Sequence, residues 1–407
     1  MNFFKIPTPC YVLENDKLKK NLEILDFVQQ QTGAKILLAL KGYAFWRSFE
    51  LVREYLKGCC ASGIYEAMLA FEEFGSREID KDICVFSPAY KASEIEQLLP
   101  IATHIIFNSF SQWQKFKAKI ELKNKQLQSL GLSEIQVGLR VNPLYSEVYP
   151  PIYNPCIPGS RLGIVPSEFS KGVQEFGLDG IDGLHFHTHC EQNSDVLERT
   201  LEHFQKHFEP YFSQMKQMKW LNFGGGHHIT RSDYDVAKLI TIIKDFRSKH
   251  HNIDVFLEPG EAVGWQSGFL LGEVIDIVYN EISIAILDVS ASAHMPDCLE
   301  MPYRPNIKKI SQTNEGEVIE DDRGASGGKY AYRLGGPTCL AGDVIGDYSF
   351  DTPLKVGDRI LFEDMMHYTI VKNNTFNGVP LPSLGVISNG KFELLKSFEY
   401  SDYKNRN

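Results

Sequence analysis

Eight short apolar runs alternate with amphipathic segments over the first 260 residues, and this alternation is the strongest constraint on the fold. The runs, rich in Val, Ile and Leu, span 34–41, 58–62, 82–88, 104–109, 135–142, 183–190, 220–226 and 254–260. Segments with helical spacing of apolar residues lie between them, at 16–31, 65–74, 111–122 and 195–218. Strands that each lead into a helix predict an α/β fold, a parallel (β/α)8 barrel of the TIM type.

Polar residues or glycines stand at the ends of seven of the eight runs. In a barrel of this type the active site lies at the carboxyl ends of the strands. We therefore expect one barrel mouth to hold the strand-end residues Lys41, Ser62, Asn108, Arg140, Asn142, His187, His189, Gly224 to Gly226 and Glu258.

After residue 260 the helical periodicity fades. Strand-like segments follow at 269–279, 282–289, 358–362 and 368–371, while 311–329 is polar and glycine-rich, as expected for a surface loop. The sequence thus predicts a barrel over 17–262 and a mostly β domain over 263–407. We expect the N-terminal segment 1–16 to be part of the β domain.

Charge and composition exclude several classes of protein. The net charge is −10, whereas binding to nucleic acid requires a basic face. No apolar run reaches the roughly 18 residues of a membrane-spanning helix, and residues 1–10 lack the apolar stretch of a secretory signal. None of the eight cysteines forms a Cys-x-x-Cys pair, so the sequence has neither a zinc-ribbon nor a thioredoxin motif. Without an export signal, we expect reduced thiols in a cytoplasmic protein with no membrane or nucleic-acid partner.

Two strand ends suggest covalent and phosphate chemistry. Lys41 ends an apolar strand, where burial would lower its pKa and suit it to form a Schiff base, unless it extends to solvent at the rim. Gly224, Gly225 and Gly226 would offer backbone N–H groups to a phosphate, or form a flexible turn.

Two other strand ends suggest ring binding. His185, His187 and His189 alternate, so on a strand they would face one side and could bind zinc, or one could stack on a planar cofactor. Glu258 could hold a protonated ring nitrogen, or remain a loop carboxylate in water. A metal would leave Lys41 without a role, so we expect pyridoxal phosphate and no metal.

The same residues resemble the alanine-racemase-like (fold type III) pyridoxal-phosphate decarboxylases. The resemblance rests on six motifs in order: Ala39-Leu40-Lys41, Phe186-His187, Gly224 to Gly226, Glu258-Pro259-Gly260, Gly336 to Cys339, and Tyr368-Thr369 with Thr375 to Gly378 beyond it. It implies that Lys41 holds the cofactor, His187 stacks on its ring, the glycines and Tyr368 bind its phosphate, and Glu258 binds the ring nitrogen. It also implies a homodimer with shared active sites, in which the partner supplies Cys339 as the catalytic proton donor.

Within this family, segments 185–191 and 294–305 are most similar to the branch that acts on carboxynorspermidine and carboxyspermidine, which implies a polyamine-type substrate. Two positions depart from the family pattern. Glu261 replaces an arginine that meets the phosphate, and Leu340 replaces an aspartate that binds a distal amine. The cationic amines of a polyamine need carboxylates, for which we select Glu261, Asp297 and Asp343.

The sequence is also compatible with other functions. A decarboxylase of diaminopimelate, ornithine or arginine is one alternative, and Arg304 could bind the distal carboxylate of diaminopimelate. An amino-acid racemase is a weaker alternative, because the Cys339 motif resembles that of the decarboxylases. A non-catalytic homologue is also weaker, because the chain has both Lys41 and Cys339. A metal-dependent hydrolase that uses the three histidines as ligands is a further alternative. An absorption spectrum would distinguish it, because only a cofactor bound to lysine as an imine absorbs near the visible range.

Overall fold

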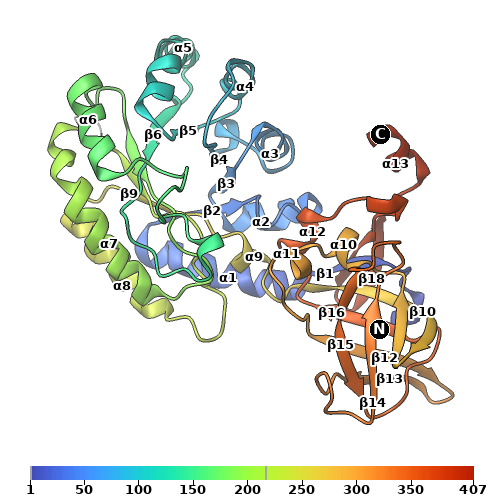
Figure 1. The fold of residues 1–407 in the computed structure, drawn as a ribbon. Coiled ribbons are helices and arrows are strands. Elements are labelled where there is room, and N and C mark those ends of the chain that lie inside the picture. Colours follow the sequence, from blue (N-terminus) through green and yellow to red (C-terminus); the bar gives the residue numbers. More distant parts are fainter. Residues whose placement is uncertain (1, 216–217) are drawn as a thin grey trace. The chain divides into compact units, whose positions relative to one another are not determined.

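A computed structural model describes residues 2–215 and 218–407 (Figure 1). Contacts within the chain divide it into two units, Lys19–Val263 and a second unit that combines the segment up to Leu18 with Gly264–Asn407. Among the described residues, no helix is both long and apolar enough to cross a membrane.

The first unit is a closed barrel of eight parallel strands, and the predicted (β/α)8 fold is confirmed. Each predicted run contains one strand. The strands are β2 (Lys35–Ala39), β3 (Gly58–Ala61), β4 (Asp82–Phe86), β5 (His104–Phe107), β6 (Gln136–Arg140), β7 (Gly183–His185), β8 (Trp220–Asn222) and β9 (Asp254–Leu257). Each strand pairs with the next, and β9 closes the barrel on β2.

Helices follow the strands and lie outside them (Figure 1). Their bounds are α1 (Asn15–Thr32), α2 (Phe49–Tyr55), α3 (Ile64–Leu69), α4 (Ala92–Leu98), α5 (Phe110–Ser129), α6 (Pro166–Phe176), α7 (Ser194–Phe208), α8 (Val236–Lys249) and α9 (Glu261–Gly264). The helix predicted over 195–218 ends at Phe208 and continues as a 3-10 helix over Glu209–Gln214, since Pro210 cannot continue the α-helical hydrogen bonds. Residues 216 and 217 of that prediction lie outside the described part of the chain.

One tryptophan fills the barrel interior. Trp220 is buried among Leu37, Cys84, Ile106 and Phe256. The neighbouring strands accommodate its indole with glycines: Gly183 is the register partner of Trp220, and Gly138 is the partner of Gly183. A Cβ atom would lie 2.2 Å from the indole at Gly183 and 2.3 Å from it at Gly138. Small residues on two strands therefore make room for a large one on the third.

The second unit is built on a ten-stranded sheet. Strand β1 pairs with β10 and β17, so the N-terminal segment belongs to this sheet. The strands are β1 (Cys10–Glu14), β10 (Gly268–Asn280), β11 (Ile282–Leu287), β12 (Ile307–Thr313), β13 (Gly316–Asp321), β14 (Tyr330–Gly335), β15 (Val344–Phe350), β16 (Arg359–Glu363), β17 (Ser383–Ser388) and β18 (Lys391–Lys396). Its helices are α10 (Ala291–His294), α11 (Asp297–Glu300), α12 (Thr369–Lys372) and α13 (Tyr400–Arg406).

Two sequence predictions in this unit are wrong. The expected surface loop 311–329 begins within an antiparallel hairpin, β12–β13. No residue of β13 is buried, so no apolar alternation marks this strand. A cross-strand ion pair of Lys309 with Glu320 (2.7 Å) supports the hairpin instead. The expected strand 368–371 is the one-turn helix α12, because the chain turns sharply at Tyr368 (φ 43°, ψ −58°).

The packing of Trp220 predicts that Gly183→Ala destabilises the barrel by about 1–3 kcal/mol, because the added methyl group overpacks the indole. The midpoint of thermal unfolding, followed by far-ultraviolet circular dichroism, measures the effect. Gly63→Ala is the matched control, since a Cβ atom there would meet nothing within 4 Å. Equal midpoints for the two variants would contradict this account of the interior.

Candidate active site

Backbone hydrogen bonds hold three strand ends together at the barrel mouth. The Ala39 N–H donates to the Pro259 carbonyl (3.0 Å), and the Glu258 N–H donates to the Gly224 carbonyl (2.8 Å). A Cβ atom on Gly260 would lie 3.1 Å from the Cα atom of Gly42. The turn that carries Lys41 therefore lies directly beside the segment that follows Glu258, as the sequence predicted.

Glu258 is a buried carboxylate with partners from three other strands. Its Oε1 accepts a hydrogen bond from Asn222 Nδ2 (2.7 Å), and its Oε2 lies 3.4 Å from His185 Nε2. Burial acts to raise the pKa of Glu258, but His185, the Asn222 hydrogen bond and the charge of Arg140 outweigh it and lower this pKa. Burial lowers the pKa of His185. The pair is therefore an ionised carboxylate beside a neutral imidazole.

Arg140 supplies a buried cation at the end of β6. Its guanidinium lies over the ring of Phe86, 4.4 Å from the centroid, and donates to the His187 carbonyl (3.3 Å). Burial lowers the pKa of Arg140 to about 10, which leaves it charged at neutral pH. The sequence placed Arg140 at a strand end but gave it no role.

The glycine run works differently from the expected phosphate nest. The Gly224 N–H donates to Asn222 Oδ1 (2.8 Å) and the Gly225 N–H donates to His187 Nδ1 (2.8 Å), so both groups are bonded within the protein. A Cβ atom would lie 2.1–2.4 Å from a carbonyl oxygen at each glycine, Gly226 included. The glycines are required because the backbones approach closely, and Asn222, which the sequence analysis did not select, joins this loop to Glu258.

His187 is fixed as a neutral ring by this loop. Its Nδ1 accepts from Gly225, so the ring proton lies on Nε2. Burial lowers the pKa of His187 well below its usual range, and the charges of Lys41 and Arg140 lower it further. An oriented, uncharged imidazole at the mouth is suited to stack on an aromatic cofactor.

The expected face of three alternating histidines does not exist. Strand β7 ends at His185, so the alternation is not continued. His185 contacts Glu258, whereas His189 lies 3.0 Å from Thr200 Oγ1 of α7 and 3.3 Å from His227 Nδ1. These histidines therefore have separate surroundings and do not converge on one ligand.

A different cluster of potential cation ligands lies at the mouth, on two loops and the start of α9. Glu191, His228 and Glu261 have ligating atoms within 4.8 Å of one another. Glu261 Oε1 lies 3.4 Å from His228 Nε2. Lys41 is exposed, which differs from the expected burial. Burial raises the pKa of the nearby Cys190 to about 11, the charges of Glu191 and Glu261 raise it further, and the charge of Lys41 lowers it. This part of the rim is rich in carboxylates beside Lys41.

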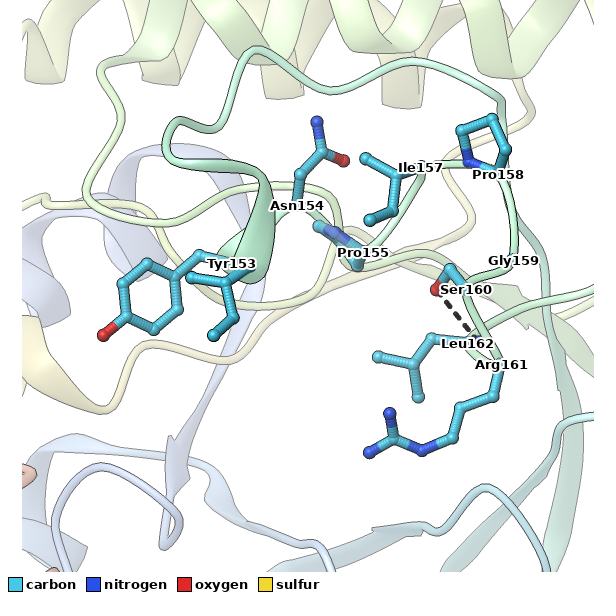
Figure 2. Close-up of a pocket in the computed structure, with 10 residues that line it drawn as sticks. Tyr153, Asn154, Pro155, Ile157, Pro158, Gly159, Ser160, Arg161 and Leu162 are labelled. Carbon is cyan, nitrogen blue, oxygen red and sulfur yellow. Dashed lines mark hydrogen bonds between the residues drawn. The ribbon is translucent and has the colours of Figure 1, made fainter. Parts of the chain in front are cut away.

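The loop after β6 forms a hollow of about 310 Å³ (Figure 2). Its lining runs from Ile152 to Leu162. The side chain of Asn108, one of the polar strand ends, anchors the loop: Nδ2 donates to the Arg161 carbonyl and Oδ1 accepts from Gly163 N–H, both at 2.7 Å. None of the predicted site residues lines this hollow.

In the second unit, Tyr368 and Cys339 lie on separate turns. Tyr368 is the centre of a tight turn in which the Thr369 N–H donates to the His367 carbonyl, a strained conformation for an aromatic residue. Cys339 follows β14, and it is the one exposed thiol among the eight free cysteines. Its N–H donates to Asn377 Oδ1 (3.0 Å).

The two aspartates selected for substrate amines differ. Asp343 is 4% exposed and both carboxylate oxygens accept protein hydrogen bonds, so a bound amine would find no free oxygen. Asp297 Oδ2 accepts from Tyr303 (2.9 Å) and Thr369 (2.8 Å). Its Oδ1 is buried and has no hydrogen-bond partner among the described residues. The geometry therefore favours Asp297 over Asp343.

The residues at the barrel mouth fit a phosphorylated pyridine aldehyde. An ionised, buried Glu258 suits a protonated ring nitrogen, an oriented neutral His187 suits a ring face, and Lys41 offers an amine on the adjoining strand end. A barrel with this rim, followed by a sheet unit, defines a pyridoxal-phosphate enzyme of the barrel class.

Comparisons with known proteins identify the family. The family model described as "Pyridoxal-dependent decarboxylase, C-terminal sheet domain" matches residues 10–366. The chain therefore belongs to the pyridoxal-dependent decarboxylases, and its cofactor is pyridoxal 5'-phosphate. The family resemblance seen in the sequence is confirmed.

Individual relatives match the whole chain. The carboxynorspermidine/carboxyspermidine decarboxylase of Campylobacter jejuni is 47% identical, with 100% of both chains covered. The carboxyaminopropylagmatine decarboxylase of Synechocystis is 43% identical, covering 98% of this chain and 95% of the relative. A crystal structure of the Campylobacter jejuni carboxynorspermidine decarboxylase complexed with norspermidine has a TM-score of 0.83 and 46% identity, with 99% and 100% of the two chains covered.

Asn222 generates a prediction, because one amide supports both the buried carboxylate and the glycine loop. Asn222→Ala leaves two buried polar groups without a partner, each at a cost of about 1–3 kcal/mol, so cofactor affinity should fall about tenfold or more. Absorbance titration of the cofactor-free protein with pyridoxal phosphate measures this. Asn124→Ala is the matched control, because Asn124 exchanges two hydrogen bonds with Ile135 before β6, at the opposite end of that strand. Wild-type affinity in Asn222→Ala would contradict the assignment.

Proposed function

We propose that this chain decarboxylates carboxynorspermidine and carboxyspermidine to norspermidine and spermidine, a step of polyamine synthesis. The observation that carries the proposal is 47% identity over the full length of a relative with that activity in its name. The similarity to a structure with norspermidine bound supports it. The acidic rim formed by Glu191 and Glu261 suits a substrate with several cationic amines.

Carboxyaminopropylagmatine is the second candidate substrate, since the Synechocystis relative is nearly as similar. The two substrate types differ at the end farthest from the reacting carbon, which is an ammonium group in one and a guanidinium group in the other. Both terminal groups are cations, so the acidic rim alone does not discriminate between the two substrates. Diaminopimelate instead ends in a carboxylate, which would be repelled by such a rim.

Turnover of a panel tests the proposal: carboxynorspermidine, carboxyspermidine, carboxyaminopropylagmatine, diaminopimelate, ornithine and arginine. We expect the highest kcat/KM for the two carboxylated triamines. One methylene separates these two, and such a difference changes the transition-state free energy by only about 1–3 kcal/mol. A higher kcat/KM for the guanidinium substrate would favour the second candidate, and a preference for diaminopimelate would overturn both.

The residues of the barrel mouth take the following roles in the proposal. Pyridoxal phosphate, when bound, supplies a ring that accepts the electron pair left behind by carbon dioxide. Lys41 would hold the cofactor through its aldehyde. Glu258 would accept a hydrogen bond from the protonated ring nitrogen, and His187 would pack on the ring. Tyr368 and, within the loop Gly224 to Gly226, the Gly226 N–H would bind the phosphate, since the Gly224 and Gly225 N–H groups already donate to Asn222 and His187.

Cys339 is the proposed proton donor to the α-carbon after carbon dioxide leaves. We propose that it acts in the site of a second copy of the chain, in a homodimer with shared active sites in the cytoplasm. Cys339 is exposed on a turn, which supports a role in a site formed with another chain. The eight free thiols suit a reducing compartment such as the cytoplasm.

The shared site predicts complementation between two inactive chains. Lys41→Ala and Cys339→Ala chains should each lose nearly all turnover, whereas subunit exchange should restore about a quarter of wild-type sites, because one of the two mixed sites in each heterodimer is intact. Activity is measured after exchange, with heterodimers quantified by native mass spectrometry. Heterodimers without recovered activity would argue that each chain completes its own site.

We propose that Glu261 and Asp297 bind the amines of the substrate. Glu261 lies beside Glu191 at the mouth, and Asp297 keeps one buried oxygen unused by the described residues of the protein. Because an amine buried without a carboxylate is costly, these groups should contribute to transition-state binding.

Glu261→Gln and Asp297→Asn should therefore weaken transition-state binding of the triamine by about 2–5 kcal/mol each, measured as kcat/KM, without changing the cofactor absorption spectrum. Glu198→Gln serves as the control, because Glu198 pairs with Lys238 on the outer helices. If both variants turn over the triamine at wild-type efficiency, neither carboxylate binds the substrate.

A further inference from the structure

The turn that carries Cys339 is closed by its own backbone. It spans residues 336–343, between β14 and β15. The Gly336 N–H donates to the Asp343 carbonyl (2.9 Å), and the Asp343 N–H donates to the Leu340 carbonyl (2.9 Å). Cys339 therefore lies on a compact turn whose two ends are joined at Asp343.

The side chain of Asp343 occupies the inside of this turn. Its Oδ2 accepts hydrogen bonds from Thr338 Oγ1 (2.7 Å) and Thr338 N–H (3.3 Å). Ser290 Oγ lies 3.0 and 2.9 Å from the two oxygens, and the Ser292 N–H donates to Oδ1 (3.2 Å). Asp343 thus ties the residue before Cys339 to the start of α10.

Two further contacts leave the turn little freedom. A Cβ atom on Gly336 would lie 2.3 Å from Asp343 Oδ2, so the turn is wrapped closely around the carboxylate. On the other side, Asn377 Oδ1 accepts from the Cys339 N–H (3.0 Å). Asn377 has a left-handed backbone (φ 60°, ψ 14°), which asparagine adopts more readily than most residues. Cys339 is exposed, yet its backbone is held from two sides.

We propose that Asp343 and Asn377 are positioning residues that fix the Cys339 thiol, and that Asp343 does not bind substrate. The catalytic consequence rests on the proposed function, in which Cys339 donates a proton. Proton transfer requires the donor to lie within hydrogen-bond distance of the acceptor. A more mobile turn would therefore lower the rate of proton transfer and leave substrate binding unchanged.

Alkylation of Cys339 in the substrate-free protein tests the positioning directly. Native protein is treated with iodoacetamide, and peptide mass spectrometry follows the Cys339 peptide. Asp343→Asn loses acceptor capacity and places an NH₂ group against donors, and Asn377→Gly removes one acceptor but keeps the left-handed backbone. Asp343→Asn should alkylate at least about threefold faster than wild type, because it disturbs buried hydrogen bonds that hold the turn. Asn377→Gly loses one exposed hydrogen bond, so it should alkylate faster than wild type by a smaller factor. Thr338→Val tests the same contact if Asp343→Asn fails to fold.

The control is Asp347→Asn, since Asp347 lies on the adjoining β15 but pairs with Arg333 (2.8 Å) away from the turn. In steady-state assays the positioning variants should lower kcat about tenfold with KM and the cofactor spectrum unchanged. Wild-type alkylation rates in all three variants would overturn the proposal, whatever the substrate of the chain is. Faster alkylation with wild-type kcat would overturn the catalytic consequence and count against Cys339 as the proton donor.

Discussion

A buried negative charge at the barrel mouth is the constraint on which the proposed site depends. An isolated carboxylate as buried as Glu258 would be protonated, because burial disfavours the charged form. Asn222, His185 and Arg140 reverse this effect, and each comes from a different strand. When β6 to β9 are in register, these three groups keep the buried carboxylate ionised, which couples the electrostatics of the site to closure of the barrel.

The rest of the rim follows from this arrangement. Asn222 is oriented by Glu258 and in turn bonds the Gly224 N–H, and the next glycine orients His187. The three glycines are needed because neighbouring backbones occupy the space of any side chain. A chain of short contacts thus runs from the buried charge to the ring that faces the mouth, and Lys41 lies on the strand end beside it.

The parts of the fold that could be predicted are those with local signals. Each barrel strand lies within an apolar run, and seven of the eight runs end at a polar residue or glycine, so the eight strands and the mouth residues could be found from the sequence. The helix α12 could not, because Thr369 is held by Asp297, 72 residues away. Asn222 was missed for the same reason, since its partner Glu258 lies 36 residues further along. The histidine alternation misled because β7 ends at His185, which no local pattern shows.

Reduction of the cofactor-loaded protein with borohydride, followed by peptide mapping, is the most direct test of the central claim that this barrel mouth holds pyridoxal phosphate on Lys41. Reduction makes the bond between lysine and cofactor permanent, so the modified peptide identifies the lysine without any assay of activity. The account predicts a single phosphopyridoxyl group on the peptide that contains Lys41. The same group on any other lysine would contradict it.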